Sequence, residues 1–177
     1  EVGSETKQGA ASTFLYDTLT RLCAALGMDG SEYRRLVAGS FLVSCDNAHA
    51  VHPNHGEFAD KNHAVRMNGG VVIKYNANQR YTSDAVSVGI FRTICTKAGV
   101  PVQYYANRAD MPGGSTLGNI SNTQVSLNAV DIGLAQLAMH SPFETAGAAD
   151  TASLVKALTV FFEHALVAER DGVYRFL

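Results

Sequence analysis

Apolar runs of strand length alternate with longer segments whose apolar residues recur every three or four positions, and this alternation most restricts how the chain can fold. The clearest runs are Phe41–Cys45, which ends at Asp46, and Val71–Tyr75. Continuous apolar runs of this length are typical of strands buried on both faces of a sheet. The sequence therefore predicts an α/β fold in which helices pack on a central sheet.

The remaining elements follow from the same spacing rules. Residues 12–26 form a predicted amphipathic helix that stops at Gly27, and residues 31–37 form a short helix. The segment 113–116 is glycine-rich but lacks the lysine of a phosphate-binding loop, so we interpret it as the start of another helix. Two further strands are predicted at residues 100–105 and 130–132.

The last two predicted helices are placed by their capping residues. Thr82 or Ser83 is predicted to cap a helix that ends before Gly99. Asp150 or Thr151 is predicted to cap a long helix that ends near Glu169. On this helix Lys156 is expected to be a solvated charge.

Composition restricts the class of protein and its partners. A chain of 177 residues with 46% apolar and 17% charged residues is sufficient for one domain with a substantial core. No apolar run is long enough to cross a bilayer, and a net charge of -2 provides no basic surface for nucleic acid, so neither partner is expected. The three cysteines, Cys23, Cys45 and Cys95, are far apart and are expected to be reduced core thiols in a cytoplasmic protein.

Several residues that can bind metal or transfer protons lie near predicted strand ends. Asp46 directly follows a strand and precedes His49, and the carboxyl edge of a sheet is where sites of α/β proteins form. His140 ends an apolar stretch at the start of a loop, and Lys74 lies near the end of a strand. Each also has an ordinary interpretation: a loop histidine, a hydrogen-bonded core histidine and a solvated lysine. The spacing matches no closed structural zinc site.

Five ordered motifs decide between these interpretations. They lie at residues 46–54, at 72–74 with 76–81, at 114–118, at 130–133 and at 139–141. Together they resemble the aspartyl aminopeptidase family of metallopeptidases, and the resemblance extends from Glu1 to about Phe162. Several motifs in the correct order are far less probable by chance than any one alone.

The resemblance implies an active site with two divalent metal ions, for which zinc is expected. It places Asp46 on the first ion, and His140 and Glu1 on the second. Asp46, His49, Lys74 and Tyr81 match positions that contact the substrate. The family's catalytic base immediately precedes the position of Glu1, so no catalytic base is assigned in this chain. Asp46 and His140 are expected to converge, with His164 away from them.

The resemblance also implies the organisation of the protein. Residues 1–177 correspond to the C-terminal part of a single catalytic domain, a central mixed sheet flanked by helices, without its N-terminal part and an inserted oligomerisation domain. The expected function is release of N-terminal Asp or Glu from peptides through a water activated by two zinc ions, in a homo-oligomer. The chain alone, lacking the N-terminal portion as its partner, is expected to be inactive. Two alternatives remain: a neutral or broad-specificity aminopeptidase, or a non-catalytic metal-binding or assembly fragment.

Overall fold

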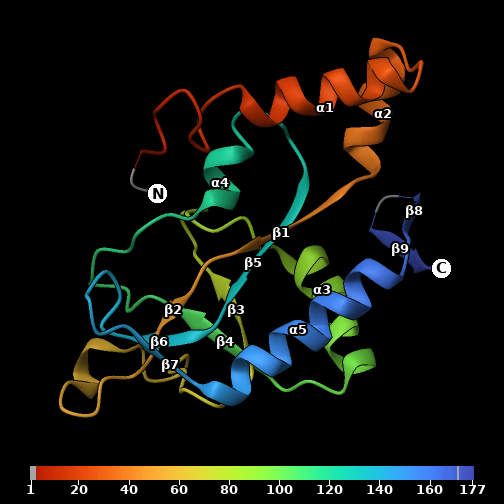
Figure 1. Cartoon of the computed structure of the whole chain (residues 1–177). Coiled ribbons are helices and arrows are strands. Elements are labelled where there is room, and N and C mark those ends of the chain that lie inside the picture. Colours follow the sequence, from red (N-terminus) through yellow and green to blue (C-terminus); the bar gives the residue numbers. More distant parts are fainter. Residues whose placement is uncertain (1–2, 171) are drawn as a thin grey trace.

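A mixed four-stranded sheet with helices packed against it forms the centre of the structure, a computed structural model that describes residues 3–170 and 172–177. This confirms the predicted fold class. The elements in chain order are α1 (Phe14–Ala25), α2 (Gly30–Gly39), β1 (Phe41–Cys45), β2 (Ala48–His49), η1 (Gly56–Phe58), β3 (Val71–Tyr75), α3 (Ala85–Ala98), β4 (Val102–Ala106), α4 (Leu117–Ser121), β5 (Asn128–Gly133), β6 (Ala135–Leu137), β7 (Thr145–Ala146), α5 (Ala148–Glu163), β8 (Leu166–Arg170) and β9 (Val173–Phe176) (Figure 1).

The order of the central sheet is β1-β5-β3-β4. Strands β1 and β5 are parallel, β3 and β4 are parallel, and β3 is antiparallel to β5. Beyond the sheet, β1 and β5 continue side by side into the parallel pair β2 and β6, to which β7 adds an antiparallel strand (Figure 1). The carboxyl ends of β1 and β5 therefore lie at one end of the sheet's strands, and the carboxyl ends of β3 and β4 lie at the opposite end.

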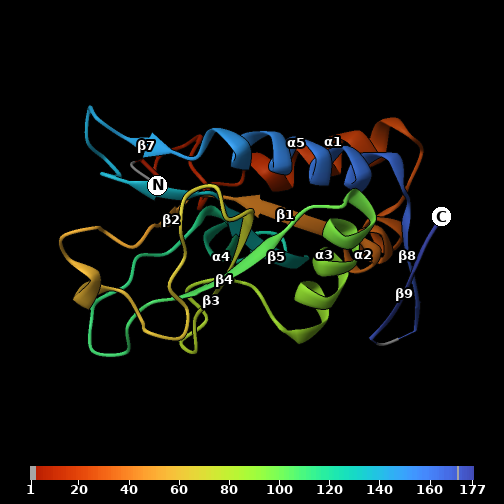
Figure 2. The same ribbon diagram turned by 90° about the horizontal axis from the view of Figure 1, so that it is seen from below.

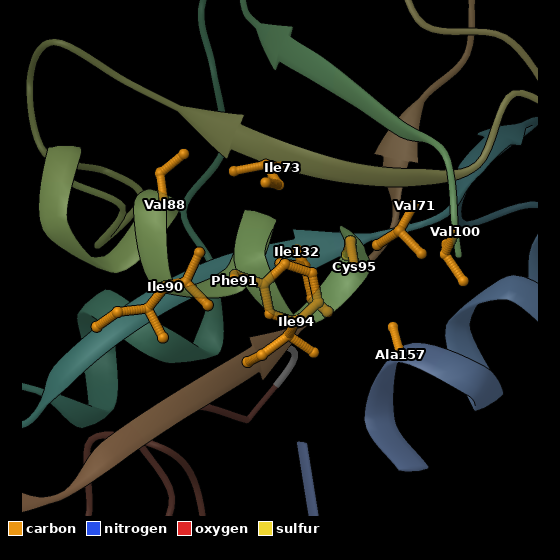
Figure 3. Close-up of a cluster of buried hydrophobic side chains, with 11 residues drawn as sticks. Val71, Ile73, Val88, Ile90, Phe91, Ile94, Cys95, Val100, Ile132 and Ala157 are labelled. Carbon is orange, nitrogen blue, oxygen red and sulfur yellow. The ribbon is translucent and has the colours of Figure 1, made fainter. Parts of the chain in front are cut away.

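One face of the sheet is covered by α3 and α5, which lie next to each other in both views (Figures 1 and 2). The core between them is apolar. Phe91 and Ile94 of α3 are fully buried against Ile73 of β3 and Ile132 of β5, with Ala157 of α5 nearby (Figure 3). Burying side chains of this size stabilises the fold by about 1.5–3 kcal/mol each, so this layer is the main source of stability for the part of the chain described.

The opposite face of the sheet is polar at its centre. Asp131 of β5 is fully buried, and its carboxylate accepts hydrogen bonds from the backbone N–H and hydroxyl of Thr82 and from the hydroxyl of Thr116, at 2.6, 2.8 and 2.7 Å. A buried carboxylate is tolerated only when its oxygens are satisfied in this way. Asp131 thus fixes the loops that precede α3 and α4 above the strand that carries Lys74.

These contacts correct the predicted caps. Thr82 and Ser83 are engaged by Asp131, so Asp84 caps α3 instead, in a reciprocal pair with Ser87. Asp150 does not cap α5 either, because its buried carboxylate accepts hydrogen bonds from the backbone N–H groups of Asn68 and Gly70.

The end of the last helix was also predicted wrongly. Helix α5 ends at Glu163, and beyond it Leu166–Arg170 and Val173–Phe176 form the antiparallel strand pair β8 and β9, so Glu169 lies on a strand. Apolar residues of the hairpin pack against the same core as α5. Contacts with that core, rather than local helical preference, therefore decide the structure of this segment.

Two expectations about burial differ from the structure. Cys23 and Cys95 are buried free thiols, as expected, but Cys45 is exposed because it ends β1, an edge strand of the sheet. Helix α1 forms where predicted, yet its apolar residues Phe14 and Leu22 are 64% and 53% exposed. Within the described residues, no helix is long and apolar enough to cross a membrane.

The close approach of β1 and β5 beside Asp46 requires a glycine. A Cβ atom on Gly133 would overlap the backbone carbonyl of Asp46, whereas one on Gly89, in α3, would meet nothing within 4 Å. We expect Gly133→Ala to cost about 3 kcal/mol and to lower the melting temperature of the full-length protein by roughly 5 °C or more. Gly89→Ala, the matched control, should leave the melting temperature unchanged or slightly higher. Equal melting temperatures for both variants would show that β1 and β5 can move apart here at little cost in the free energy of unfolding.

Candidate active site

Asp46 occupies the point where β1 leaves the central sheet. Its backbone N–H donates to the carbonyl of Ile132 at 2.8 Å, so the residue is held beside the end of β5. The next residue, Asn47, receives the backbone N–H of Leu134 on its side-chain oxygen at 3.0 Å. The Asp46 carboxylate, 31% exposed, therefore stands on a rigid turn with one side open to solvent.

Lys74 is buried beneath this turn. Its side chain is 4% exposed, and its ammonium lies 3.8 Å from the Asp46 carboxylate. The ammonium also donates hydrogen bonds to the backbone carbonyls of Asp46 and Asn47, at 3.3 and 3.1 Å. It lies 4.6 Å from the ring centre of Tyr81. The expectation that Lys74 could be a solvated surface charge is therefore wrong, and its cationic group is positioned against Asp46.

Tyr81 forms the wall behind Lys74. The ring is buried, and its hydroxyl donates a hydrogen bond to the side-chain oxygen of Asn107 at 3.0 Å. Arg80 fixes the same segment by donating to the carbonyl of Gly113 at 2.7 Å. The loops after β3 and β4 are thus joined around the lysine.

His49 is the candidate residue whose pKa is affected by the charges of other candidate residues. Partial burial of its imidazole lowers its pKa, the nearby charges of Lys74 and His140 lower it further, and Asp46 opposes them. The structure therefore brings His49 within electrostatic range of all three. The lowered pKa favours the neutral imidazole, which can donate one hydrogen bond and accept another.

His140 lies in the loop after β6, with its side chain exposed. Its backbone has a φ of 67°, in the left-handed region, and its N–H donates to the carboxylate of Glu144 at 2.7 Å. A non-glycine residue in this region is uncommon, although His and Asn are among the more tolerant. The backbone conformation turns the chain sharply beside His49.

Asp46 and His140 are the right kinds of donor for zinc, which binds carboxylate oxygen and imidazole nitrogen. Among residues 3–170 and 172–177, no group of three or more His, Cys, Asp or Glu side chains that could hold a metal is found. Glu1, the third predicted ligand, lies outside the described residues. The described donors therefore fit zinc in type but not in number.

A cavity of about 300 Å³ lies beside these residues, bounded by the loop after β2, the end of β4 with its following loop, and β6. His49, Asn107 and Ala138 belong to its wall. Of the other lining residues, Phe58, Arg108 and Met111 were not identified from the sequence. Phe58 ends the short helix η1, Arg108 and Met111 lie in the loop after β4, and none of them belongs to a motif or a periodic pattern.

Two residues predicted to lie outside the site do so. His164 directly follows α5, where its ring nitrogen pairs with the carbonyl of Val160 at 2.9 Å and its ring packs edge-on against Phe176. Lys156 lies on α5 and is exposed. Both belong to the C-terminal helix and hairpin rather than to the turn that carries Asp46.

The model of the Peptidase_M18 family, described as aminopeptidase I zinc metalloprotease, matches residues 1–162. The chain belongs to this family. A probable M18 family aminopeptidase 2 of Clostridium novyi is 46% identical to this M18 chain over 162 residues, which are 92% of the chain and 37% of that protein. A probable aspartyl aminopeptidase of Ricinus communis is 43% identical over 163 residues, 92% of the chain and 33% of that protein. The M18 chain thus spans about a third of the length of these relatives.

Solved structures show the same fold. A cryo-EM structure of the Ape4 and Nbr1 complex matches the M18 chain with a TM-score of 0.88 and 38% identity, over 92% of this chain and 31% of that one. The structure of the S. cerevisiae mApe1 dodecamer matches with a TM-score of 0.78 and 28% identity, over 92% and 36%. Structural neighbours of the M18 chain therefore include oligomers, and the chain corresponds to part of their subunit.

Proposed function

We propose that the full-length protein containing this chain is a metallo-aminopeptidase that releases N-terminal Asp or Glu from peptides. The observation that carries the proposal is the buried Lys74 ammonium, which is 3.8 Å from the Asp46 carboxylate and close to His49. A cation fixed in a desolvated wall can pair with an acidic side chain far more strongly than a solvated lysine can. The name of the Ricinus communis relative, a probable aspartyl aminopeptidase, agrees with this specificity.

We further propose that two zinc ions bind in the complete site. Asp46 would hold the first, His140 and Glu1 the second, and the remaining ligands and the catalytic base would come from the N-terminal part of the polypeptide. Zinc bound there would polarise the scissile carbonyl and lower the pKa of a water. Lys74 would pair with the acidic side chain, Tyr81 would support Lys74, and neutral His49 would donate or accept a hydrogen bond with the substrate backbone.

The lengths of the relatives are consistent with the proposed domain organisation. Residues 1–177 form the C-terminal part of one catalytic domain, and the N-terminal part and an inserted oligomerisation domain lie outside the chain. The mApe1 dodecamer supports a homo-oligomer for the full-length protein. The exposed apolar residues of α1, including Phe14 and Leu22, supply surface for packing against the rest of the subunit or another subunit. We propose a cytoplasmic location.

Hydrolysis of short peptides that differ only in their first residue tests this function. The zinc-loaded full-length protein is expected to release Asp or Glu with a kcat/KM roughly tenfold or more above that for Leu. Residues 1–177 alone should release none of them, because catalysis by a group of cooperating residues collapses when some are missing. Equal rates for Asp and Leu would favour the broad-specificity alternative, and zinc-dependent turnover by residues 1–177 would contradict the proposed division of the site.

A further inference from the structure

The cavity of about 300 Å³ adjoins the proposed metal and substrate site and shares one described residue, His49, with it. His49 lies in its wall, and Asn107, also in the wall, accepts the hydroxyl hydrogen bond of Tyr81. The residues that line it do not include Asp46, Lys74 or His140. The cavity is therefore a neighbouring compartment. His49 and Asn107 separate it from the region around Lys74 that is proposed to bind the acidic side chain of the substrate.

The walls of the cavity are held in place by one contact between its two loops and by contacts within each loop. Arg108 donates to the backbone carbonyl of Glu57, and its guanidinium also pairs with Asp110 at 2.7 Å. On the other side, the ring of His55 stacks on Phe58 with centres 5.4 Å apart. The loop that carries η1 is thus tied to the loop after β4, and the space between them is largely formed before a ligand arrives.

The chemistry of the lining favours a neutral side chain. Both charged residues in the lining have partners: Arg108 pairs with Asp110, and Asp60 accepts a hydrogen bond from the ring nitrogen of His63 at 2.8 Å. The rest of the lining combines apolar and aromatic residues with neutral polar side chains. The apolar and aromatic residues include Phe58, Tyr105, Met111, Pro112 and Leu137, and the polar side chains are those of His49, His52, His55, Asn107 and Gln136. Cavities of roughly 300 Å³ are at the small end of ligand sites, and one of this size accepts a large side chain.

We propose that this cavity binds the side chain of the second residue of the peptide substrate, and that it favours aromatic or large apolar residues there. The inference rests on the proposed function. In that proposal the side chain of the first substrate residue pairs with Lys74, and the scissile bond lies beside Asp46. The part of the peptide substrate that continues past His49 then enters the cavity. The side chain of the second substrate residue is the one that reaches the cavity, because the region around Lys74 already holds the side chain of the first.

The experiment uses the full-length enzyme and two pairs of peptides, Asp-Phe-Ala with Asp-Ala-Ala and Leu-Phe-Ala with Leu-Ala-Ala. The wild type is expected to cleave the Phe member of each pair with a kcat/KM roughly tenfold above the Ala member. Phe58→Ala removes one wall and Met111→Trp narrows the space, so both should lower this ratio toward one. Phe58 and Met111 are 55% and 38% exposed, so neither change empties the core. Phe162→Ala, which removes an exposed aromatic side chain on α5, should keep the wild-type ratio.

The four peptides separate this inference from the proposed function. A wild-type ratio near one for both pairs would overturn the cavity assignment even if Asp is preferred over Leu at the first position. A change in the Asp-to-Leu preference of Phe58→Ala, with the Phe-to-Ala ratio unchanged, would assign the cavity to the first residue and also overturn the inference. If Leu is cleaved as well as Asp but both pairs show the tenfold ratio, the acidic specificity fails and the cavity assignment holds.

Discussion

Replacing His140 by asparagine in the full-length enzyme is expected to lower both its bound zinc and its turnover by at least about 100-fold at limiting zinc. Loss of a residue that only supports a metal ligand already costs about 10–100-fold in affinity or activity, and loss of a ligand should cost more. Asparagine suits this position because the backbone of His140 is left-handed, a conformation that asparagine tolerates. The side chain is exposed, so the change should not disturb the core.

The measurements are zinc content after dialysis and kcat/KM at a series of zinc concentrations. His164→Asn is the matched control, because His164 lies at the end of α5 and packs against Phe176. It should leave zinc content and turnover near their wild-type values. If the His140→Asn variant keeps its full zinc content, with or without activity, His140 is not a zinc ligand.

Lys74→Met is expected to lower kcat/KM for peptides with N-terminal Asp or Glu by roughly 30-fold or more, and to change a leucine peptide much less. Removing one partner of a buried charge pair typically costs about 2–5 kcal/mol, and each 1.4 kcal/mol is worth about tenfold. Methionine retains most of the length and volume of the lysine side chain, so it removes the charge without emptying the space beneath Asp46. Lys74→Ala should show the same selectivity with an added loss of stability.

The structure allows a second role for Lys74, and the same assay separates the two. Its ammonium donates to the carbonyls of Asp46 and Asn47, so it also positions the turn that carries Asp46. If positioning is its only role, acidic and neutral peptides should slow equally, and that result would favour a broad aminopeptidase. Lys156→Met, on the exposed surface of α5, is the control and should leave both rates nearly unchanged.

The strands were easier to predict from the sequence than the helix caps. The runs Phe41–Cys45 and Val71–Tyr75 form strands with the predicted bounds. Val71–Tyr75 is the buried strand that such a run indicates, whereas Phe41–Cys45 is only partly buried because it lies at the edge of the sheet. The cap at Thr82 or Ser83 failed because the partner that captures these residues, Asp131, lies almost fifty residues away. Capping preferences consider only neighbouring residues in the sequence, so they cannot predict a hydrogen bond to a residue as distant as Asp131.

The sequence by itself determined the α/β class and, through its ordered motifs, the family, and it predicted a set of site residues. It could not show that β3 runs antiparallel to β5, so it could not show how Lys74 reaches Asp46 across the sheet. It also gave no sign of the cavity beside His49, because its walls combine the ends of strands with loops that lie far apart in the sequence. Strand direction and loop closure depend on contacts between distant segments, and only the tertiary structure supplies those contacts.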